Sequence, residues 1–459
     1  MKKGVAAFIF AIFCINMFST GFIKSYEFTS TCVFNSFSLL SDGGFIATGY
    51  CDQQGSTPTT LSDGQLSDIV VARFDSYGEI EWQYSYGGSE NDLGYGVIPT
   101  SDGGFLVVGE TTSLGAQLSD AIIFKVDKLG VILWARIFGG AGDDWAVDAK
   151  EDDKGNYLIL GVTPNSSGGD GGGKEDEQPP NNDIFLLSLT PGGFVNFGKT
   201  YDGGDDDSVY QLYKNKDGEF LIAGTSKSKS GQNYNGIAVK IDGAGIIKWQ
   251  KYYGNLSDNY AYSITEGNDG GYLLVGETSL SAEESKGWVV RIDSFGGDTW
   301  QKSYGYKSDG VKTSEFIQSA KPYGSHGFLL CGGSTSSTNE YYSFAFKIDW
   351  SGKIIWKKSY KINGKELLYQ AKPTKDKGIA MLGVSASSSA LTSFIVKTDK
   401  KGEIDTCSAI EDSPLKRVKL SSGSGNLKFT NTTSALTLTI VDESLQKSES
   451  GVEESSVCE

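Results

Sequence analysis

Histidine, methionine and proline are scarce in this sequence, and closely spaced cysteines are absent from it. The 459 residues include one histidine, three methionines and nine prolines, and no two cysteines form a Cys-x-x-Cys motif. A zinc or thiol-redox site therefore has almost no residues from which it could be built. The one histidine, His326, has no serine or cysteine nucleophile motif beside it, so we interpret it as a loop residue rather than a general base.

Positive charge is also in deficit. The chain has 41 Lys and Arg against 57 Asp and Glu, a formal net charge of −16. The nearest basic cluster, Lys416-Arg417-Val418-Lys419, is short and isolated. Such a surface repels phosphate backbones and anionic lipid headgroups. We therefore expect neither a nucleic-acid partner nor docking to an anionic membrane.

The first 21 residues have the layout of a secretory signal peptide. Lys2 and Lys3 precede an uncharged apolar stretch that runs from Gly4 to Phe18, and small residues follow at positions 19–21. We expect the protein to be secreted or held at the cell surface, with no membrane insertion once the signal is removed. A retained signal anchor is the alternative, because the uncharged run reaches Ile23.

The cysteines beyond the signal segment fit an oxidising compartment, where disulfides persist. Cys407 ends the last repeat and Cys458 lies one residue from the chain end, so a bridge between them would pin the tail. Cys32 and Cys51 flank one predicted hairpin and form a second candidate pair. Cys331 lies in an apolar strand, where a buried free thiol is expected.

The dominant feature of the sequence is a repeat of fifty to sixty residues. Versions of Asp-Gly-Gly-Phe-Leu-Val-Val-Gly, then (Val/Ile)-Asp-x-x-Gly-x-Ile-x-Trp-x-x-x-Tyr-Gly, recur along it, and the glycine that ends the first motif falls at Gly49, Gly109, Gly161, Gly224, Gly276, Gly332 and Gly383. Each unit contains four short β-branched and aromatic runs separated by turn signals, and no segment shows a sustained helical period. Such units must stack on their neighbours, which predicts an all-β propeller.

Both ends of the repeat region indicate how a ring would close. Residues 22–26 match the fourth strand of other units, whereas the last unit stops at Cys407 without that strand. We therefore predict a seven-bladed β-propeller of four-stranded antiparallel blades over residues 22–410, its ring closed by the N-terminal strand. Residues 411–459 form a tail that we expect to be partly disordered, with a hairpin at residues 427–441 and a polar, acidic segment at residues 443–459 that is mobile except at Cys458. A monomer is expected.

An aromatic residue follows the second turn of the unit at a fixed distance. It lies four residues after the turn glycine, at Trp82, Trp134, Phe197, Trp249, Trp300 and Trp356. We interpret these side chains as packing elements between adjacent blades.

Acidic residues recur nine or ten residues after this aromatic position. They are Asp92, Asp144, Asp207 and Asp258, followed by Asp309 and Glu366 in the less regular units. We expect them to ring the mouth of the central channel. Their oxygens are the ligands that Ca²⁺ prefers, so Ca²⁺ is the one cofactor to consider. The alternative is that each carboxylate caps its own turn.

The loops between the second and third strands vary in length and composition, whereas the other turns are short and uniform. Variation on one face marks it as a candidate binding surface. Tyr234, Tyr341 and Tyr342 lie in these loops, where they could stack on sugar rings.

The unit Asp-x-x-Gly-x-Ile-x-Trp, as at residues 75–82 and 242–249, resembles the repeat of bacterial secreted β-propeller proteins. It is distantly similar to the Trp-docking repeat of quinoprotein dehydrogenases, but it lacks the threonine and one residue of that repeat, and the chain has no vicinal cysteine pair. The resemblance implies an extracytoplasmic scaffold.

Our leading hypothesis is a non-enzymatic interaction module that presents its variable loop face to a protein or glycan partner. The alternative is a hydrolase or lyase that acts on polysaccharide with Asp92, Asp144, Asp207 and Asp258 as its acids. A degraded quinoprotein is the third hypothesis.

Overall fold

The computed structural model describes the repeat region and parts of the tail. The described residues are 21–28, 31–52, 66–115, 118–140, 142–164, 181–203, 206–227, 233–254, 257–306, 311–362, 365–386, 391–404 and, in the tail, 410–412, 416–418, 423–425, 446–449 and 452–458. These residues form strands and turns without any helix. The described part of the chain therefore contains no helix that could span a membrane.

Consecutive strands pair antiparallel in runs of four. The first three runs are β2 (Cys32–Leu39), β3 (Phe45–Asp52), β4 (Ser67–Phe74) and β5 (Ile80–Gly87); β6 (Asp92–Pro99), β7 (Phe105–Thr111), β8 (Asp120–Val126) and β9 (Ile132–Phe138); and β10 (Trp145–Glu151), β11 (Tyr157–Pro164), β12 (Asn182–Leu189) and β13 (Val195–Tyr201). The next two are β14 (Asp207–Lys214), β15 (Phe220–Lys227), β16 (Tyr234–Ile241) and β17 (Ile247–Gly254); and β18 (Asn259–Glu266), β19 (Tyr272–Ser281), β20 (Glu284–Ile292) and β21 (Asp298–Gly305).

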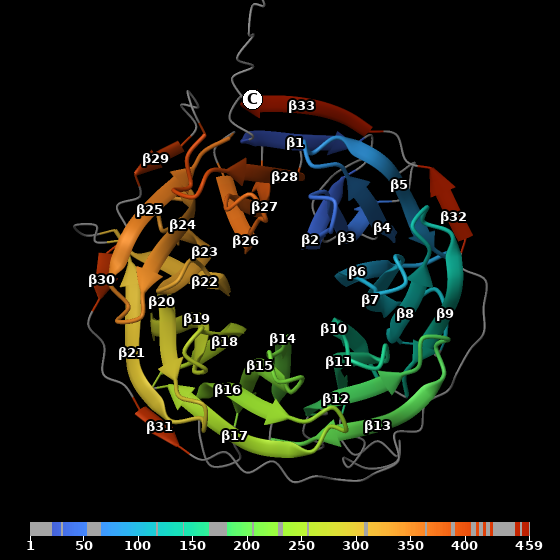
Figure 1. Ribbon diagram of the computed structural model, residues 1–459, viewed down its shortest axis with the longest axis horizontal. Coiled ribbons are helices and arrows are strands. Elements are labelled where there is room, and N and C mark those ends of the chain that lie inside the picture. The colour runs from blue at the N-terminus through green and yellow to red at the C-terminus, as the bar shows by residue number, and fades with distance from the viewer. Residues whose placement is uncertain are drawn as a thin grey trace, which may run out of the picture.

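The remaining strands complete two further runs, and the last of these uses the N-terminal strand. They are β22 (Thr313–Pro322), β23 (Gly327–Ser336), β24 (Tyr341–Asp349) and β25 (Ile354–Tyr360); and β26 (Lys365–Pro373), β27 (Ile379–Ala386), β28 (Leu391–Thr398) and β1 (Phe22–Phe28). Figure 1 shows the runs placed around a common axis, with the first strand of each run innermost. The prediction of an all-β propeller is confirmed.

The repeated Asp-x-x-Gly motif forms the turn before the outer strand. In the second run, Asp127 Oδ1 accepts hydrogen bonds from the backbone N–H groups of Leu129 (2.8 Å) and Val131 (2.9 Å). Gly130 has a φ of 77°, and a Cβ there would lie 2.7 Å from the Tyr84 ring. The turn therefore needs an aspartate to satisfy its backbone and a glycine for its left-handed conformation and close packing.

Tyrosines of six outer strands join a run to the next, whereas β9 has Phe138 at this position. The phenol donates a hydrogen bond to the carbonyl of the turn glycine in the following run, as in Tyr86 to Gly130 (2.7 Å), Tyr201 to Gly245 (2.8 Å), Tyr253 to Gly296 (2.8 Å), Tyr304 to Gly352 (2.7 Å) and Tyr360 to Gly402 (3.1 Å). Tyr26 of β1 makes the same bond to Gly78 O in the first run (2.8 Å). The N-terminal strand therefore takes the position that the other outer strands occupy.

The tryptophans of the outer strands lie at the same contacts between neighbouring runs. We call these contacts the outer joints. The indole N–H groups of Trp82 and Trp134 donate to the carbonyls of Lys128 (3.1 Å) and Pro191 (2.9 Å), which belong to the turns of the next run. Around these joints the apolar strand residues form buried clusters between neighbouring sheets. The core is thus distributed between the sheets rather than gathered in one centre.

The described pieces of the tail are short strands on the outside of the repeat region. These strands are β29 (Ile410–Asp412), β30 (Lys416–Val418), β31 (Gly423–Gly425), β32 (Gln446–Glu449) and β33 (Val452–Cys458). They add as fifth strands to β25, β21, β17, β5 and β1, around the outside of the ring (Figure 1). The physical reason is that outer strands present unpaired backbone groups, which another strand can satisfy. The predicted hairpin at residues 427–441 lies outside the described residues.

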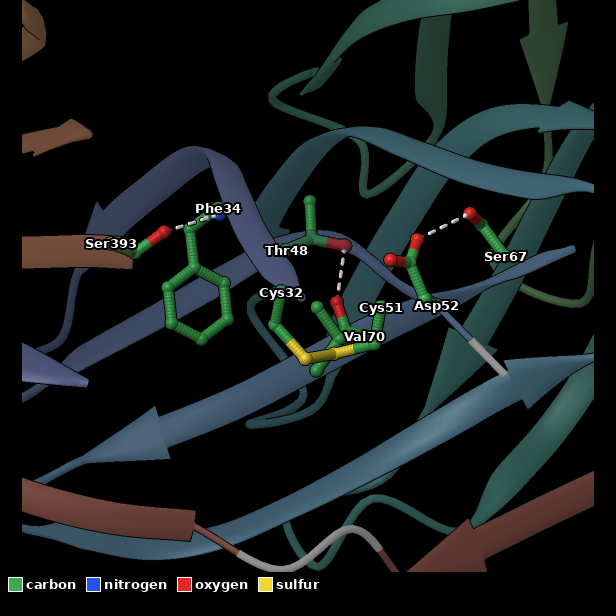
Figure 2. Close-up of a disulfide and its surroundings, with 8 residues drawn as sticks. All are labelled: Cys32, Phe34, Thr48, Cys51, Asp52, Ser67, Val70 and Ser393. Carbon is green, nitrogen blue, oxygen red and sulfur yellow. Dashed lines mark hydrogen bonds between the residues drawn. A yellow bond between two sulfur atoms is a disulfide. The ribbon is translucent and has the colours of Figure 1, made fainter. Parts of the chain in front are cut away.

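One predicted disulfide is present. Cys32 and Cys51 lie opposite each other in the β2–β3 ladder, with their Cα atoms 4.1 Å apart, and their sulfurs are bonded (Figure 2). Beside this disulfide, the backbone N–H of Phe34 donates to Ser393 Oγ (2.8 Å), which links the first run to β28. Cys331 is free and buried, as expected. Cys407 lies outside the described residues, so its pairing with Cys458 stays a prediction.

Candidate functional site

A cavity with a mixed polar and apolar lining lies where the innermost strands converge. Its volume is about 780 Å³, and residues of β2, β6, β10, β14, β18, β22 and β26 all contribute to its wall. Every four-strand run therefore supplies its first strand to one shared site, which we call the channel.

Each innermost strand carries a β-bulge at the same place. The register shift leaves one residue of each strand without a cross-strand partner, and these residues are Asn35, Tyr95, Val147, Tyr210, Tyr262, Gln318 and Tyr369. All of them line the channel. A bulge re-aims a side chain out of the normal alternation of a strand, which is why one repeated irregularity produces a ring of channel residues.

Four of the bulged residues are tyrosines, and they make one end of the channel aromatic. Tyr210 and Tyr262 meet edge to face with their ring centroids 5.0 Å apart, and Tyr210 is 39% exposed. The Tyr262 hydroxyl donates to Glu277 Oε1 (2.7 Å). Burial raises the pKa of Tyr210 and that of Tyr369 to about 12, so both phenols are neutral hydrogen-bond donors at physiological pH.

At four of the seven bulges, the residue after the bulge connects neighbouring innermost strands. Its side chain accepts a hydrogen bond from a backbone N–H of the next strand: Asp148 Oδ2 from Leu212 (3.0 Å), Gln211 Oε1 from Ile264 (2.7 Å), Ser263 Oγ from Ala320 (3.3 Å) and Gln370 Oε1 from Phe37 (3.3 Å). The last of these bonds joins β26 to β2. Polar side chains therefore bond the innermost strands to one another along the channel wall. The same side chains can hydrogen-bond water in the channel.

Lysines line the channel further along the same strands. Lys150 and Lys214 have carboxylate partners, Asp148 and Asp153, each with an N–O distance of 2.7 Å.

Lys372 Nζ donates to the Phe37 carbonyl and lies 3.4 Å from Ser38 Oγ. Lys321 Nζ lies 5.9 Å from the centre of the Tyr213 ring. Neither Lys321 nor Lys372 forms a salt bridge with any carboxylate in the described ranges of the chain.

The surroundings of the two unpaired lysines disfavour their charged forms. Desolvation, followed by repulsion from neighbouring lysines, lowers the pKa of Lys321 to about 8 and that of Lys372 to about 7. Both side chains face the channel and are half-buried. The channel of this acidic protein thus contains several lysines close together, and two of them, Lys321 and Lys372, are only partly protonated near neutral pH.

The predicted acids begin the innermost strands, but they turn toward their own loops. Asp92 Oδ2 accepts the Gly88 N–H (2.8 Å) and the Ser113 hydroxyl (2.7 Å), while Asp144 Oδ2 accepts the Gly140 N–H (2.8 Å). In the next run Asp207 Oδ2 accepts the Gly203 N–H (2.6 Å). The three aspartates are 0–4% exposed, and none of them lines the channel. Each of these three carboxylates therefore accepts a backbone N–H of the turn that precedes its own strand, which is the turn-capping role given above as the alternative to a Ca²⁺ site.

The other predicted ligands are separated from these aspartates. Asp258 Oδ1 accepts the backbone N–H of Tyr234 (2.9 Å), whose ring stacks on Tyr260. Tyr341 contacts Lys365, with Nζ 5.1 Å from the ring centre. Asp309 lies outside the described residues. The structure therefore does not bring the predicted residues together in one site.

One group of acids has the composition of a cation site. Carboxylate oxygens of Asp183, Asp202 and Asp207 lie within 4.8 Å of one another. Burial, then the charges of Asp183 and Asp202, raise the pKa of Asp207 to about 8. Three carboxylates are suitable donors for Ca²⁺, and calcium binding stays a prediction.

The channel residues were missed from the sequence, although a signal for the tyrosines exists. Tyr95, Tyr210 and Tyr262 each lie three residues after the polar residue that begins their strand, at Asp92, Asp207 and Asn259. No sequence pattern identifies the channel lysines, because they come together only when strands that are far apart in the sequence are arranged around the common axis.

Comparison with known proteins yields distant structural similarity only. No family model matches the sequence, and no curated protein matches it. Hydrazine synthase of Kuenenia stuttgartiensis is 11% identical, with 61% of this chain and 79% of that chain covered and a TM-score of 0.37. A puromycin hydrolase is 11% identical (79% and 53% covered, TM-score 0.41), and the β-1,2-mannobiose phosphorylase of Listeria innocua is 12% identical (74% and 93%, TM-score 0.32). Similarities at these values support no conclusion about function.

Proposed function

We propose that the four-strand runs form a closed seven-bladed ring in which β1 completes the last blade. The support is local. β1 pairs with β28 over residues 22–26, and Tyr26 makes the same bond to the first run that the other outer-strand tyrosines make to theirs. On the inside, the bond from Phe37 N–H to Gln370 joins the last innermost strand to the first. A closed ring leaves no blade edge open and holds the channel walls at fixed positions.

We further propose that the protein is an extracytoplasmic carbohydrate-binding propeller whose ligand lies in the channel. The observation that carries the proposal is the convergence of Tyr95, Tyr210, Tyr262 and Tyr369 with amide side chains on one cavity. Aromatic faces stack on the apolar faces of sugar rings, and phenols and amides bond sugar hydroxyls. The Cys32–Cys51 disulfide is consistent with a location outside the cytoplasm.

The test is a glycan array followed by calorimetry with each oligosaccharide that binds. Tyr210→Ala removes a partly exposed ring from the channel and should weaken binding about tenfold, or ~1.4 kcal/mol. Tyr77→Ala is the matched control, because this 67% exposed tyrosine lies in a turn away from the channel. An absence of glycan binding by the wild type, or equal effects of both substitutions, would reject the proposal.

A polysaccharide-cleaving enzyme is the second candidate. Burial raises the pKa of Asp144 to about 6 and that of Asp207 to about 8, in the range that suits a general acid near neutral pH. The assay is release of reducing ends from a polysaccharide panel by the wild type and by Asp144→Asn and Asp207→Asn. Turnover that both substitutions abolish would favour the enzyme, whereas no turnover by the wild type would dismiss it.

The variable loop face remains a predicted surface for a protein or glycan. Much of it, including residues 53–65, 165–180 and 228–232, lies outside the described residues.

A further inference from the structure

We propose that the lysine end of the channel binds an anionic group, a carboxylate or a sulfate, so that the ligand is an acidic glycan. This inference deepens the carbohydrate-binding function proposed above and rests on it. Its basis is the pair formed by Lys321 and Lys372, which both line the channel and have no carboxylate partner among the described residues.

Lysines that are more deeply buried than this pair have carboxylate partners. Lys125 lies 2.8 Å from Asp102, Lys286 lies 2.8 Å from Glu315, and Lys397 lies 3.2 Å from Asp376. The fold therefore neutralises these buried lysines. Lys321 and Lys372 lack such a partner within the described residues, although acidic residues are abundant in the chain.

The acids that line the channel are already engaged. Asp148 bonds Lys150 and the Leu212 N–H, and Glu151 accepts the Ser101 N–H (2.7 Å) and the Ser101 hydroxyl. Neither carboxylate forms a salt bridge with Lys321 or Lys372, and the negative charge of Asp148 only partly offsets the repulsion at the two ammonium groups. Positive charges held near each other without a counter-ion are unfavourable, and an anion between them would remove that cost.

The charge state of the lysines links binding to pH. Lys321 and Lys372, with pKa values of about 8 and about 7 in the free protein, are both charged at pH 6 and both largely neutral at pH 9. A bound anion favours the charged forms, so binding takes up protons and weakens as the pH rises. The titratable and charged groups that face the pair are Asp148, Lys150 and Glu151 on β10, Tyr213 and Lys214 on β14, and Cys331 on β23.

The two ends of the channel are separated along the same strands. Tyr210 and Lys214 are four residues apart on β14, which corresponds to roughly 13 Å of extended strand. A ligand that contacts both ends must be longer than one sugar ring. An oligosaccharide with an acidic residue at its inner end fits this arrangement.

The experiment is calorimetry with trigalacturonate, its fully methyl-esterified form, a sulfated galactose trisaccharide and sodium sulfate. The wild type should bind one acidic trisaccharide at least tenfold more tightly than the ester at pH 6, and this preference should fall at least tenfold by pH 9. The preferred acid tells a carboxylate ligand from a sulfate one, and sodium sulfate tests the anion without a sugar.

The decisive variant is Lys321→Met combined with Lys372→Met. Methionine keeps the aliphatic volume and removes the repulsion, so the fold should be retained, as thermal unfolding can verify. The variant should lose the preference for acid and keep its affinity for the ester. Lys248→Met, a substitution on the outer strand β17, is the control. It should change neither the preference for the acid nor the affinity for the ester.

The outcomes separate the two proposals. Equal binding of acid and ester by the wild type would overturn the anion site and leave the carbohydrate function standing. Lysine-dependent binding of acid and sulfate that ignores Tyr210→Ala would support the anion site and reject the carbohydrate function. Failure of all four probes to bind at pH 6 would overturn the inference.

Discussion

The outer joints of the ring and its channel differ in how far their residues repeat from one run to the next. At the joints the same residues recur, so that Tyr86, Tyr201 and Tyr304 make the same bond to the next run. In the channel the equivalent positions differ, with Asn35, Tyr95 and Val147 at the first three bulges. Repetition at the joints maintains one geometry, and variation within that geometry creates an asymmetric site. The difference supports our proposal that the outer joints hold the fold and that the channel binds the ligand.

The largest effect should come from removing a joint tyrosine altogether. Tyr26→Ala empties a fully buried site and deletes the bond to Gly78, so we expect a loss of about 3–5 kcal/mol in the free energy of unfolding. Tyr304→Ala is the matched variant in an ordinary run, and the two losses, measured by denaturant unfolding, should be similar. A Tyr26→Ala loss below about 1 kcal/mol, beside a large loss for Tyr304→Ala, would show that β1 is not part of the ring.

A second, smaller effect concerns Asp207, the buried acid at the start of the innermost strand β14. The folded protein holds a proton on Asp207 up to about pH 8, whereas the unfolded chain releases it above ~pH 4, so the wild type loses stability as the pH rises between these values. Asp207→Asn lacks this proton and should be more stable than the wild type at pH 8.5, by roughly 2–4 kcal/mol, but not at pH 4.

The fold already contains a precedent for this substitution, because Asn259 takes the equivalent position in the next run. Denaturant unfolding should be measured with a chelator present, so that any bound cation does not offset the charge. Parallel stability profiles of wild type and variant from pH 4 to 8.5 would contradict the assignment.

The smallest effect tests whether the joints are equivalent in energy as well as in geometry. Tyr86→Phe keeps the ring and removes only the hydroxyl that bonds Gly130 O, which should cost about 1 kcal/mol. Tyr253→Phe should cost the same, because it loses the same bond to Gly296. Thermal unfolding of the two variants should give similar shifts, and a several-fold difference would argue against equivalent joints.

The fold could be predicted from the sequence because its determinants are local and repeated. Asp127 and Gly130 specify their turn within four residues, and the strand after that turn supplies the tryptophan of the joint. The N-terminal strand could be assigned by the spacing of Phe22 from the next turn, and its pairing with β28 agrees with that assignment.

The channel could not be predicted in the same way. A bulge shifts the alternation of a strand by one residue, so a period of two no longer tells which side chains face the axis. Asp92 and Asp207 were expected at the starts of the inner strands and lie there, but bonds to Gly88 and Gly203 turn them away from the channel. Which lysines lack a partner depends on contacts between strands that are far apart in the sequence.

The most direct test of the central claim is a crystal structure of the protein with an oligosaccharide that it binds. The account predicts that the sugar lies inside the channel, with a ring stacked on Tyr210 or Tyr262 and its acidic end toward Lys321 and Lys372. A sugar held only by the loops on the outer face, with the channel holding water, would contradict it.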